Sequence, residues 1–334
     1  MSARTSLVDR FVSQPYLLYG IYFFCLGVIL YLLGVSLVLP RYLIGPYWLL
    51  TSISEWLVWY SGLPIVLGLI LAILDVLFLF DRKRSVGSLR DDSISNKRVT
   101  VALTAYNDEE SIGAAVADFR SHPSVSRVIV VSNNSSDNTL KVAENAGAIA
   151  FNELAQGYGQ CVYRCLSEAV KYDDTNFVVL CEGDRTFRSH DIDKFLAYAP
   201  HADIVNGTRI VEALRERRTQ LTTFMFYGNM FVGKLLEAKH LGSSTITDVG
   251  STYKLCRRSA LAALLPQLNR AVNLEFNAHF MDAALANKHT FVECPITFYA
   301  RVGESKGGNT SNFRALAVGL RMILGLTFGW RSSS

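Results

Sequence analysis

Two long apolar segments near the N-terminus are almost free of charged side chains. Residues 16–39 contain no charged side chain, and residues 63–80 contain only Asp75. At about 1.5 Å per residue, a helix over the first segment measures about 36 Å, which is enough to cross the hydrocarbon core of a bilayer. The connection, residues 41–62, is rich in Trp and Tyr, which concentrate at the headgroup level of membranes. The pattern predicts that residues 1–84 form a two-helix membrane hairpin with an interfacial connection.

Both flanks of this hairpin are basic. The flanking residues are Arg4 and Arg10 before the first segment, and Arg82, Lys83 and Arg84 after the second. Because loops rich in Lys and Arg stay in the cytoplasm, we expect an integral membrane protein whose large domain lies on the cytoplasmic face.

Asp75 is the one charge within the second segment, about a turn and a half before its end. A charge at the centre of a bilayer costs a few kcal/mol, so we expect Asp75 to reach the interface. An ion-pair partner within the membrane is the alternative.

After residue 97, short apolar runs alternate with segments of helical spacing. The runs are Val99–Leu103, Arg127–Val131, Ala148–Phe151 and Phe177–Cys181, and the helical segments are Glu109–Arg120, Asp137–Ala146 and Gly159–Lys171. Apolar strands separated by helices indicate a mostly parallel sheet that helices cover on both faces. Ligands bind such sheets beyond the carboxyl ends of the strands. We therefore expect an α/β catalytic domain over residues 98–312, after a polar linker over residues 85–97.

A last apolar segment, residues 313–334, carries Arg314 and Arg321 on roughly one helical face. Arg321 lies near its middle, which disfavours a membrane span. We expect an amphipathic helix at the membrane interface, with a helix packed on the core as the alternative.

The composition narrows the class of protein. Of the 334 residues, 50% are hydrophobic and 19% are charged, which excludes a disordered chain. A net charge of +4 without long basic runs argues against a nucleic-acid partner. The six cysteines form no C-x-x-C pair and have no His or Cys partner at ligand spacing, so we expect reduced structural thiols.

Polar motifs follow three of the expected strands. Residues 104–110 (T-A-Y-N-D-E-E) follow the first strand, and residues 132–139 (S-N-N-S-S-D-N-T) follow the second. Short polar side chains at these positions can hold a nucleoside, although helix capping by Ser135 or Ser136 is an alternative.

Glu182, Gly183 and Asp184 follow the fourth strand. Two carboxylates around one glycine can hold Mg²⁺ or Mn²⁺ together with substrate phosphates, and such a cation neutralises a leaving diphosphate. A solvated turn is the alternative for this tripeptide alone.

Together these motifs resemble the family 2 glycosyltransferases, and among them the dolichol-phosphate mannose synthase and polyprenyl-phosphate glycosyltransferase branch. In that branch one strand ends in P-A-Y-N-E-E, similar to residues 104–109 with Thr104 in place of Pro. A second strand ends in V-D-D-G-S-T-D-G-T, similar to residues 131–139. A D-x-D-like metal motif falls on residues 182–184.

The resemblance continues downstream and covers about residues 98–310. Residues 205–209 (V-N-G-T-R) are similar to V-x-G-S-R, and residues 247–254 (T-D-V-G-S-T-Y-K) are similar to a D-x-x-S-G-F segment. Residues 293–306 (E-C-P-I-T-F-Y-A-R-V-G-E-S-K) are similar to E-x-P-I-x-F-x-x-R-x-G-x-S-K. The end of this last motif can present two cations to a phosphate, although a solvated basic loop is the alternative.

The resemblance implies the nucleotide-diphospho-sugar transferase fold (GT-A, Rossmann-like). It implies a metal-dependent hexosyltransferase that inverts the anomeric carbon and transfers a sugar from a nucleotide-diphosphate-sugar donor to a polyprenyl phosphate acceptor. The residues it implies are Ala105, Tyr106, Glu109 and Asn133 for the nucleoside, Glu182 and Asp184 for Mg²⁺ or Mn²⁺, Arg209, Arg301 and Lys306 for phosphates, and Glu275 near the acceptor.

The chain departs from the family pattern at two positions, where Ser132 and Glu182 each replace an Asp. Two alternatives therefore stay open: a catalytically silent nucleotide-sugar-binding scaffold, and a transferase for a lipid-linked saccharide or polysaccharide. The second is disfavoured because the sequence has no Q-x-x-R-W motif and no further clear span. The sugar, the nucleobase, the polyprenol length and a homo-oligomeric state also stay open.

Overall fold

The structure is a computed structural model that describes residues 7–40, 48–84, 90–216, 219–303 and 311–330. The chain divides into two compact units. The hairpin unit is Met1–Val86 with Ala238–Ser243, and the sheet unit is Gly87–Glu237 with Ser244–Ser334.

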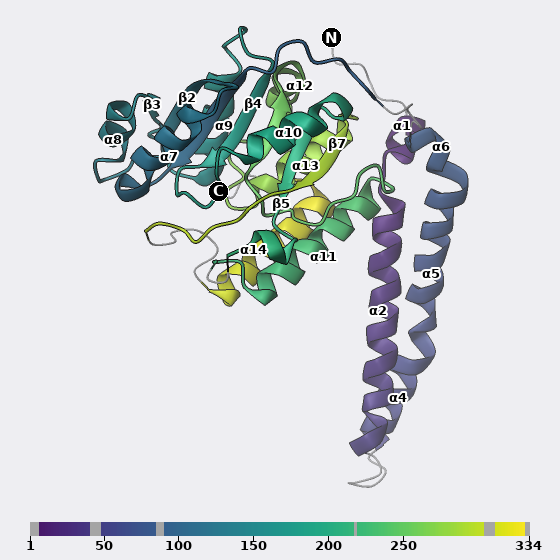
Figure 1. Ribbon diagram of the computed structural model, residues 1–334. Coiled ribbons are helices and arrows are strands. Elements are labelled where there is room, and N and C mark those ends of the chain that lie inside the picture. The colour runs from purple at the N-terminus through teal and green to yellow at the C-terminus, as the bar shows by residue number, and fades with distance from the viewer. Residues whose placement is uncertain (1–6, 41–47, 85–89, 217–218, 304–310, 331–334) are drawn as a thin grey trace. The chain divides into compact units, whose positions relative to one another are not determined.

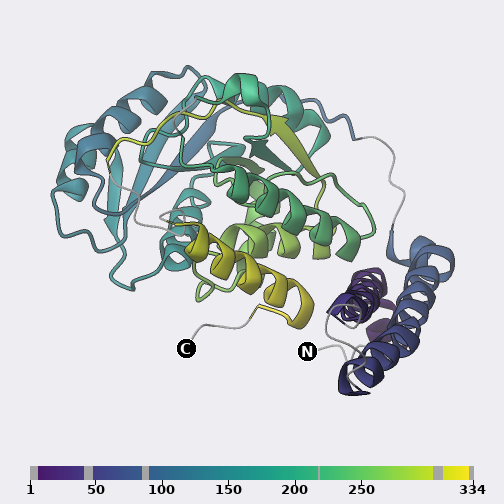
Figure 2. The same cartoon turned by 90° about the horizontal axis from the view of Figure 1, so that it is seen from below.

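The hairpin unit contains two helical stretches that are long and apolar enough to cross a membrane, Tyr16–Pro40 and Trp48–Lys83. Their elements are α2 (Tyr16–Ser36) in the first, and α4 (Trp48–Tyr60), α5 (Gly62–Ile73), the π-helical η1 (Leu74–Leu79) and α6 (Phe80–Lys83) in the second; α1 (Leu7–Val12) precedes them. Helix α2 runs beside α5 in both views (Figure 1, Figure 2). The backbones approach closely, since a Cβ at Gly68 would lie 2.6 Å from both the Gly20 oxygen and the Phe24 nitrogen.

The second helical stretch is longer than expected. It begins at Trp48, whereas the aromatic composition of residues 41–62 led us to expect an interfacial connection. Pro64 lacks an amide hydrogen, but its neighbours keep the helix together. The Ser61 amide donates to the Leu57 oxygen at 3.1 Å, and the Ile65 amide donates to the Ser61 oxygen at 3.4 Å. Aromatic composition does not distinguish an interfacial loop from a helix that continues through the interface.

Asp75 has partners within the hairpin, and an ion-pair partner was the alternative considered for this residue. Its side chain is fully buried. Asp75 Oδ2 accepts a hydrogen bond from the Leu17 amide at 2.7 Å, in the first turn of α2, and Asp75 Oδ1 forms an ion pair with Lys83. Lys83 comes from the basic flank of the second helical stretch, so this flank supplies the charge that the buried carboxylate requires.

The sheet unit is built on a seven-stranded sheet in the order β3-β2-β1-β4-β6-β5-β7 (Figure 1). The strands are β1 (Val99–Ala105), β2 (Val125–Ser132), β3 (Ile149–Asn152), β4 (Phe177–Glu182), β5 (Ile204–Thr208), β6 (Lys254–Arg257) and β7 (Phe291–Pro295). Strand β6 is antiparallel to both its neighbours, and all other pairs are parallel. The mostly parallel α/β sheet predicted from the sequence is thus confirmed.

Helices cover both faces of the sheet. They are α7 (Glu109–Ser121), α8 (Thr139–Asn145), α9 (Tyr158–Ala169), α10 (Asp191–Tyr198), α11 (Thr223–Lys239), α12 (Arg258–Leu264), α13 (Phe276–Ala286) and α14 (Asn312–Phe328), with short 3-10 turns at η2 (Ala199–His201), η3 (Glu212–Leu214) and η4 (Leu265–Gln267). Strand β1 is buried over its whole length, because α7 packs on one face and α9 on the other. This explains its uninterrupted apolar pattern.

The strand register brings the polar motifs to one edge of the sheet. Thr104 pairs with Glu182 across β1 and β4, and Ala105 pairs with Ser132 across β1 and β2. Gly183 follows directly, and its amide donates to the Thr104 oxygen at 2.9 Å. The chain segments after β1, β2 and β4 therefore begin at the same level.

Candidate active site

A cavity of about 1050 Å³ lies at this edge, within the sheet unit. Part of its wall is polar and comes from the strand ends and the loops that follow them. Its charged side chains are Asp108, Glu182, Asp184, Arg209 and Arg301, and its polar side chains include Asn133 and Tyr158. The remaining wall is largely apolar and comes from α11 and α14, which lie side by side in both views (Figure 1, Figure 2).

Glu182 and Asp184 form the acidic centre of the polar wall. Asp184 is 2% exposed, and its Oδ1 accepts hydrogen bonds from the Thr186 amide at 3.0 Å and hydroxyl at 2.6 Å. Glu182 Oε1 accepts a hydrogen bond from the Thr252 hydroxyl at 2.8 Å. Burial and, secondly, the charge of Asp184 raise the pKa of Glu182 to about 7. Two carboxylates so placed are both ionised at neutral pH only when cations lie beside them.

Arg301 supplies one such cation from the loop after β7. Its Nη1 lies 3.2 Å from Asp184 Oδ2, and its Nη2 donates to Asp108 Oδ1 at 2.8 Å. Burial alone lowers the pKa of the Arg301 guanidinium, but the Asp184 and Asp108 carboxylates outweigh burial and raise it above the usual value. Arg301 therefore connects the loop after β1 with the acidic centre. Lys306, expected as its companion, lies outside the described residues.

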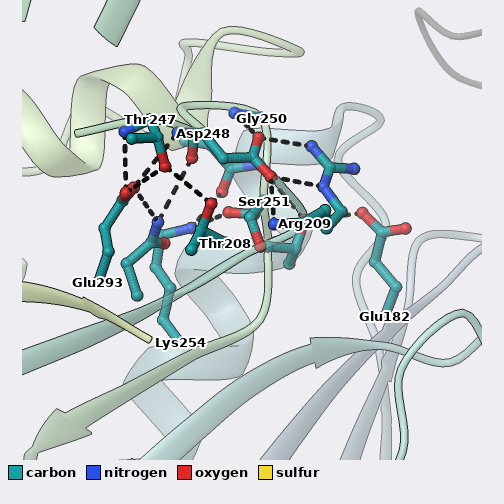
Figure 3. Close-up of polar contacts among 12 residues, drawn as sticks. Glu182, Thr208, Arg209, Thr247, Asp248, Gly250, Ser251, Lys254 and Glu293 are labelled. Carbon is teal, nitrogen blue, oxygen red and sulfur yellow. Dashed lines mark hydrogen bonds and ion pairs between the residues drawn. The ribbon is translucent and has the colours of Figure 1, made fainter. Parts of the chain in front are cut away.

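Arg209 occupies the end of β5 on the same wall (Figure 3). Its Nε and Nη2 each donate to one oxygen of Asp248 at 2.7 Å. Burial alone lowers the pKa of Arg209, but the adjacent Asp248 carboxylate raises it above the usual value, so the guanidinium stays charged. The site therefore contains a second arginine whose orientation is fixed by a bidentate ion pair.

Three of the four residues expected at the nucleoside line the cavity, namely Ala105, Tyr106 and Asn133. Tyr106 is 40% exposed and is accessible to a ligand. The Asn133 amide group holds the loop before α9, because Nδ2 donates to the Ala155 oxygen at 2.7 Å and Oδ1 accepts from the Gly157 amide at 2.9 Å. Asn133 thus shapes the cavity wall through this loop.

Glu109, the fourth residue, lies outside the cavity lining. Its Oε2 accepts a hydrogen bond from the Asn138 amide at 2.9 Å, so it joins the loops after β1 and β2. The serines considered as helix caps do the same. Ser135 Oγ accepts from the Asn107 amide at 2.9 Å, and the Ser136 amide donates to Asn107 Oδ1 at 2.8 Å. These polar side chains hold the two loops together.

Glu275 also lies outside the cavity lining. It directly precedes α13, is 7% exposed, and forms an ion pair with Arg321 of α14. Trp330, just after α14, donates its indole N–H to Asp282 Oδ2 at 2.6 Å. These contacts attach α14 to α13 and leave Glu275 with a structural partner.

Helix α14 has one buried face and one exposed apolar face. Met322 and Leu326 are buried. The exposed apolar side chains are Phe313, Leu316, Leu320, Leu324 and Phe328, which recur every three or four residues. The helix is thus packed on the sheet unit and also exposes an apolar stripe.

Several site contacts come from residues to which the sequence assigned no role. Asp108 binds Arg301, Thr252 binds Glu182, and Asp248 binds Arg209. Asp108 is part of the first polar motif, and Asp248 and Thr252 are part of residues 247–254. The motifs identified these segments but did not indicate which residues they contact. The partners are 39 to 193 positions apart in sequence, so no local spacing could reveal them.

The acidic centre suits a divalent cation that takes only two ligands from the protein, the carboxylates of Glu182 and Asp184. Among the described residues, no group of three or more His, Cys, Asp or Glu side chains is arranged to hold a metal ion. Two carboxylates are nevertheless enough for Mg²⁺ or Mn²⁺ when phosphates and water complete the coordination. The raised pKa of Glu182 fits this use, because a cation would relieve the repulsion between the carboxylates.

Comparison with known proteins agrees with this geometry. Residues 100–265 match the model of the family described as Glycosyl transferase family 2. The chain is 27% identical over 209 residues to a dolichyl-phosphate hexose transferase of Haloferax volcanii, an alignment that covers 62% of this chain and 86% of that protein. It is 25% identical over 205 residues to the glycosyltransferase AglJ of the same organism, covering 61% of this chain and 63% of that protein.

Solved structures share the fold. Glucosyl-3-phosphoglycerate synthase from Mycobacterium tuberculosis, crystallised with Mn²⁺, UDP-glucose and phosphoglyceric acid, aligns with a TM-score of 0.50. The alignment covers 70% of this chain and 81% of that chain, at 15% sequence identity. At this identity the likeness concerns the arrangement of strands and helices alone.

Proposed function

The chain carries a glycosyl transferase family 2 domain, and from this premise we propose that it transfers a hexose from a nucleotide-diphosphate sugar to a polyprenyl phosphate in the membrane. The catalytic domain would lie on the cytoplasmic face. The Haloferax volcanii dolichyl-phosphate hexose transferase supports this acceptor class.

The observation that carries the proposal is the two-part wall of the cavity. Carboxylates and arginines form one part, and apolar side chains of α11 and α14 form the other. The apolar residues include Met225, Phe231 and Val232 of α11, and Leu316, Leu320 and Ile323 of α14. A water-soluble acceptor has no use for such a wall. A polyprenyl phosphate would bind with its phosphate group among the arginines and its apolar chain along the two helices.

The exposed apolar stripe of α14 supports a position at the membrane surface. Phe224, Tyr227 and Phe231 of the neighbouring helix α11 are also exposed. Exposed apolar side chains on adjacent helices are typical of a surface that contacts lipid. We expect both helices to lie in the interface, where a lipid presents its phosphate.

Transfer of a sugar to a phosphate requires the protein to supply positive charge and to position the two substrates, and little else. The second pKa of a phosphate monoester is about 6, so the acceptor is largely a dianion at neutral pH and needs no protein base. Arg209 and Arg301 would hold the phosphates close together against their repulsion. Glu182 and Asp184 would hold Mg²⁺ or Mn²⁺, which supplies positive charge at the leaving diphosphate. A single displacement at the anomeric carbon then inverts its configuration.

Transfer by the purified full-length chain tests the proposal. UDP- and GDP-hexoses are offered with a short polyprenyl phosphate and Mg²⁺ or Mn²⁺, and products are identified by mass. The free polyprenol is the matched acceptor that lacks the phosphate. We expect a glycosyl phospholipid from the phosphate alone. Donor binding without transfer to any acceptor would instead support the scaffold, and transfer only to a lipid-linked saccharide would support the other alternative.

Cation binding is expected to strengthen as the pH rises through about 7, because Glu182 must lose its proton to become a ligand. Its pKa is raised in the folded protein, so the protonated form stabilises the metal-free protein, and that stability is lost as the pH rises through about 7. We expect the apparent Mn²⁺ affinity to fall up to about tenfold per pH unit below this value.

Calorimetric titration with Mn²⁺ at about pH 6 and about pH 8 measures this effect. Glu182→Gln is the control, because it cannot titrate and should bind Mn²⁺ weakly at both pH values. An affinity for Mn²⁺ that is equal at both pH values in the unaltered chain would contradict the assigned role of Glu182.

A further inference from the structure

One carboxylate accepts the hydrogen bonds that orient Arg209, and the centroid of the Phe298 ring lies 5.0 Å from the guanidinium carbon. Asp248 Oδ2 accepts hydrogen bonds from Arg209 Nε at 2.7 Å and from the Arg209 backbone amide at 3.1 Å, and Asp248 Oδ1 accepts from Nη2 at 2.7 Å. Figure 3 shows this pair at the centre of the network. The direction in which the guanidinium faces the cavity therefore follows the position of Asp248.

Asp248 lies in a loop between α11 and β6, and a second carboxylate holds this loop in place. Glu293 Oε2 accepts hydrogen bonds from the Thr247 amide at 2.8 Å and from the Thr247 hydroxyl at 2.5 Å. Glu293 Oε1 accepts from the Asp248 amide at 3.3 Å and from Asn206 Nδ2 at 3.2 Å. All four contacts use Glu293 as an acceptor, which only a carboxylate can provide.

The sheet connects these groups rigidly. Glu293 lies on β7 opposite Asn206 of β5, and Arg209 directly follows β5. The hydroxyls of Thr208 and Thr247 are 2.8 Å apart, which joins the end of β5 to the same loop. A shift of the loop is therefore transmitted to Arg209.

We propose that Glu293 is a positioning residue that fixes the Arg209 guanidinium for a phosphate, acting through Thr247 and Asp248. This inference rests on the proposed function, in which Arg209 and Arg301 hold phosphates, and it assigns the acceptor phosphate to Arg209. Glu293 itself is outside the cavity lining. Its effect is expected first on acceptor binding, because Glu293 contacts Thr247 and Asp248, the partner of Arg209, whereas Thr252, which binds Glu182, lies four residues further along the loop.

Glu293→Gln tests the inference with almost no change of side-chain volume. The NH₂ group of the new side chain would replace one carboxylate oxygen and face the two donors that this oxygen binds, so two of the four hydrogen bonds are lost. We expect the KM for a short polyprenyl phosphate to rise about 10- to 100-fold, with the KM for the nucleotide sugar unchanged. Thr247→Val removes one of the four donors and leaves the carboxylate, so its effect should have the same direction and be smaller.

Asp203→Asn is the matched control. Asp203 accepts hydrogen bonds from the Thr290 amide at 3.0 Å and hydroxyl at 2.9 Å, at the opposite ends of β5 and β7. It makes the same kind of strand contact far from Arg209. We expect it to lower the melting temperature without changing the KM for the acceptor.

A double-mutant cycle separates positioning from general damage. If Glu293 acts through Arg209, then Glu293→Gln lowers kcat/KM in the unaltered chain but adds nothing in an Arg209→Ala background. Equal losses in both backgrounds would overturn the inference. So would an unchanged acceptor KM in Glu293→Gln.

Binding of geranyl phosphate, compared with geraniol, distinguishes failure of the inference from failure of the proposed function. If the unaltered chain binds the phosphate but shows no transfer, the proposed reaction fails, and weaker binding by Glu293→Gln still supports the positioning role. If the unaltered chain transfers sugar and Arg209→Ala does so equally well, the inference fails and the proposed function stands. If the unaltered chain neither binds the phosphate nor transfers sugar, both are overturned.

Discussion

Replacing Asp184 with Asn is expected to lower the rate of sugar transfer about 10²- to 10³-fold while the protein stays folded. Asp184 is 2% exposed, lines the cavity and faces Arg301. Asn keeps the volume and can still accept the hydrogen bonds from Thr186, so the local turn is preserved. It removes the negative charge that Mg²⁺ or Mn²⁺ would bind, and with it the positive charge at the leaving diphosphate.

The measurement is kcat/KM with a saturating divalent cation, together with the melting temperature. Asp193→Asn is the control, because the Asp193 side chain is 77% exposed on α10. Raising the cation concentration should recover part of the lost activity in Asp184→Asn, since the Glu182 carboxylate remains. Unimpaired transfer by Asp184→Asn would show that the acidic centre has no part in catalysis.

The elements that the sequence predicted well are those whose residues all face one kind of environment. Strand β1 is buried on both faces, so its pattern is apolar throughout and needs no knowledge of the neighbours. The gathering of the polar motifs also followed from the sequence, because parallel strands end at one edge of a sheet. Asp184, Arg209 and Arg301 could be named before their contacts were known because their motifs resemble those of the family.

The features that the sequence did not predict depend on partners far along the chain. The sequence shows Asp75 near the end of an apolar segment, but its ion pair with Lys83 and its contact with the Leu17 amide exist only once the helices pack. Likewise, Glu275 was placed near the acceptor by resemblance alone, whereas its ion pair with Arg321 depends on how α14 folds back onto α13.

The same limit applies to the polar motifs. Residues 247–254 and 293–306 were recognised as similar to family segments, but their similarity did not reveal that they bind each other. Glu293 reaches the backbone of Thr247 and Asp248 because β5 and β7 are neighbours, in a sheet order that places β5 between β7 and the antiparallel β6. Strand order is a property of the whole sheet and leaves little trace in any one segment.

Replacing Arg301 with Gln is expected to lower the stability of the protein as well as its activity. Arg301 is the cation shared by Asp108 and Asp184, which are 7% and 2% exposed. Removing one partner of a buried ion pair costs about 3–5 kcal/mol, because the remaining charges stay buried without compensation. For a domain of this size, that corresponds to a fall in melting temperature of roughly 10 °C.

Arg127→Gln is the control, since it also removes an arginine that makes two contacts with carboxylate oxygens. Arg127 donates to both oxygens of Asp174 at 2.7 and 2.6 Å, but the Asp174 side chain is 43% exposed. Exposed pairs contribute about 0–1 kcal/mol, so its melting temperature should change little. The difference in melting temperature between the two variants measures how much burial increases the cost of losing an Arg–Asp ion pair.

The pH dependence of Arg301→Gln gives the sharpest test of this explanation. Burial already raises the pKa of Asp108, and loss of Arg301 removes an interaction that lowers it. A carboxyl whose pKa is raised in the folded state stabilises the protein when protonated and loses that contribution as the pH rises. The instability of Arg301→Gln should therefore be greater at about pH 8 than at about pH 5, and Mn²⁺ should restore more stability to it than to the unaltered chain. If the loss were the same at both pH values and insensitive to Mn²⁺, Arg301 would act by packing and not as the shared cation of the two carboxylates.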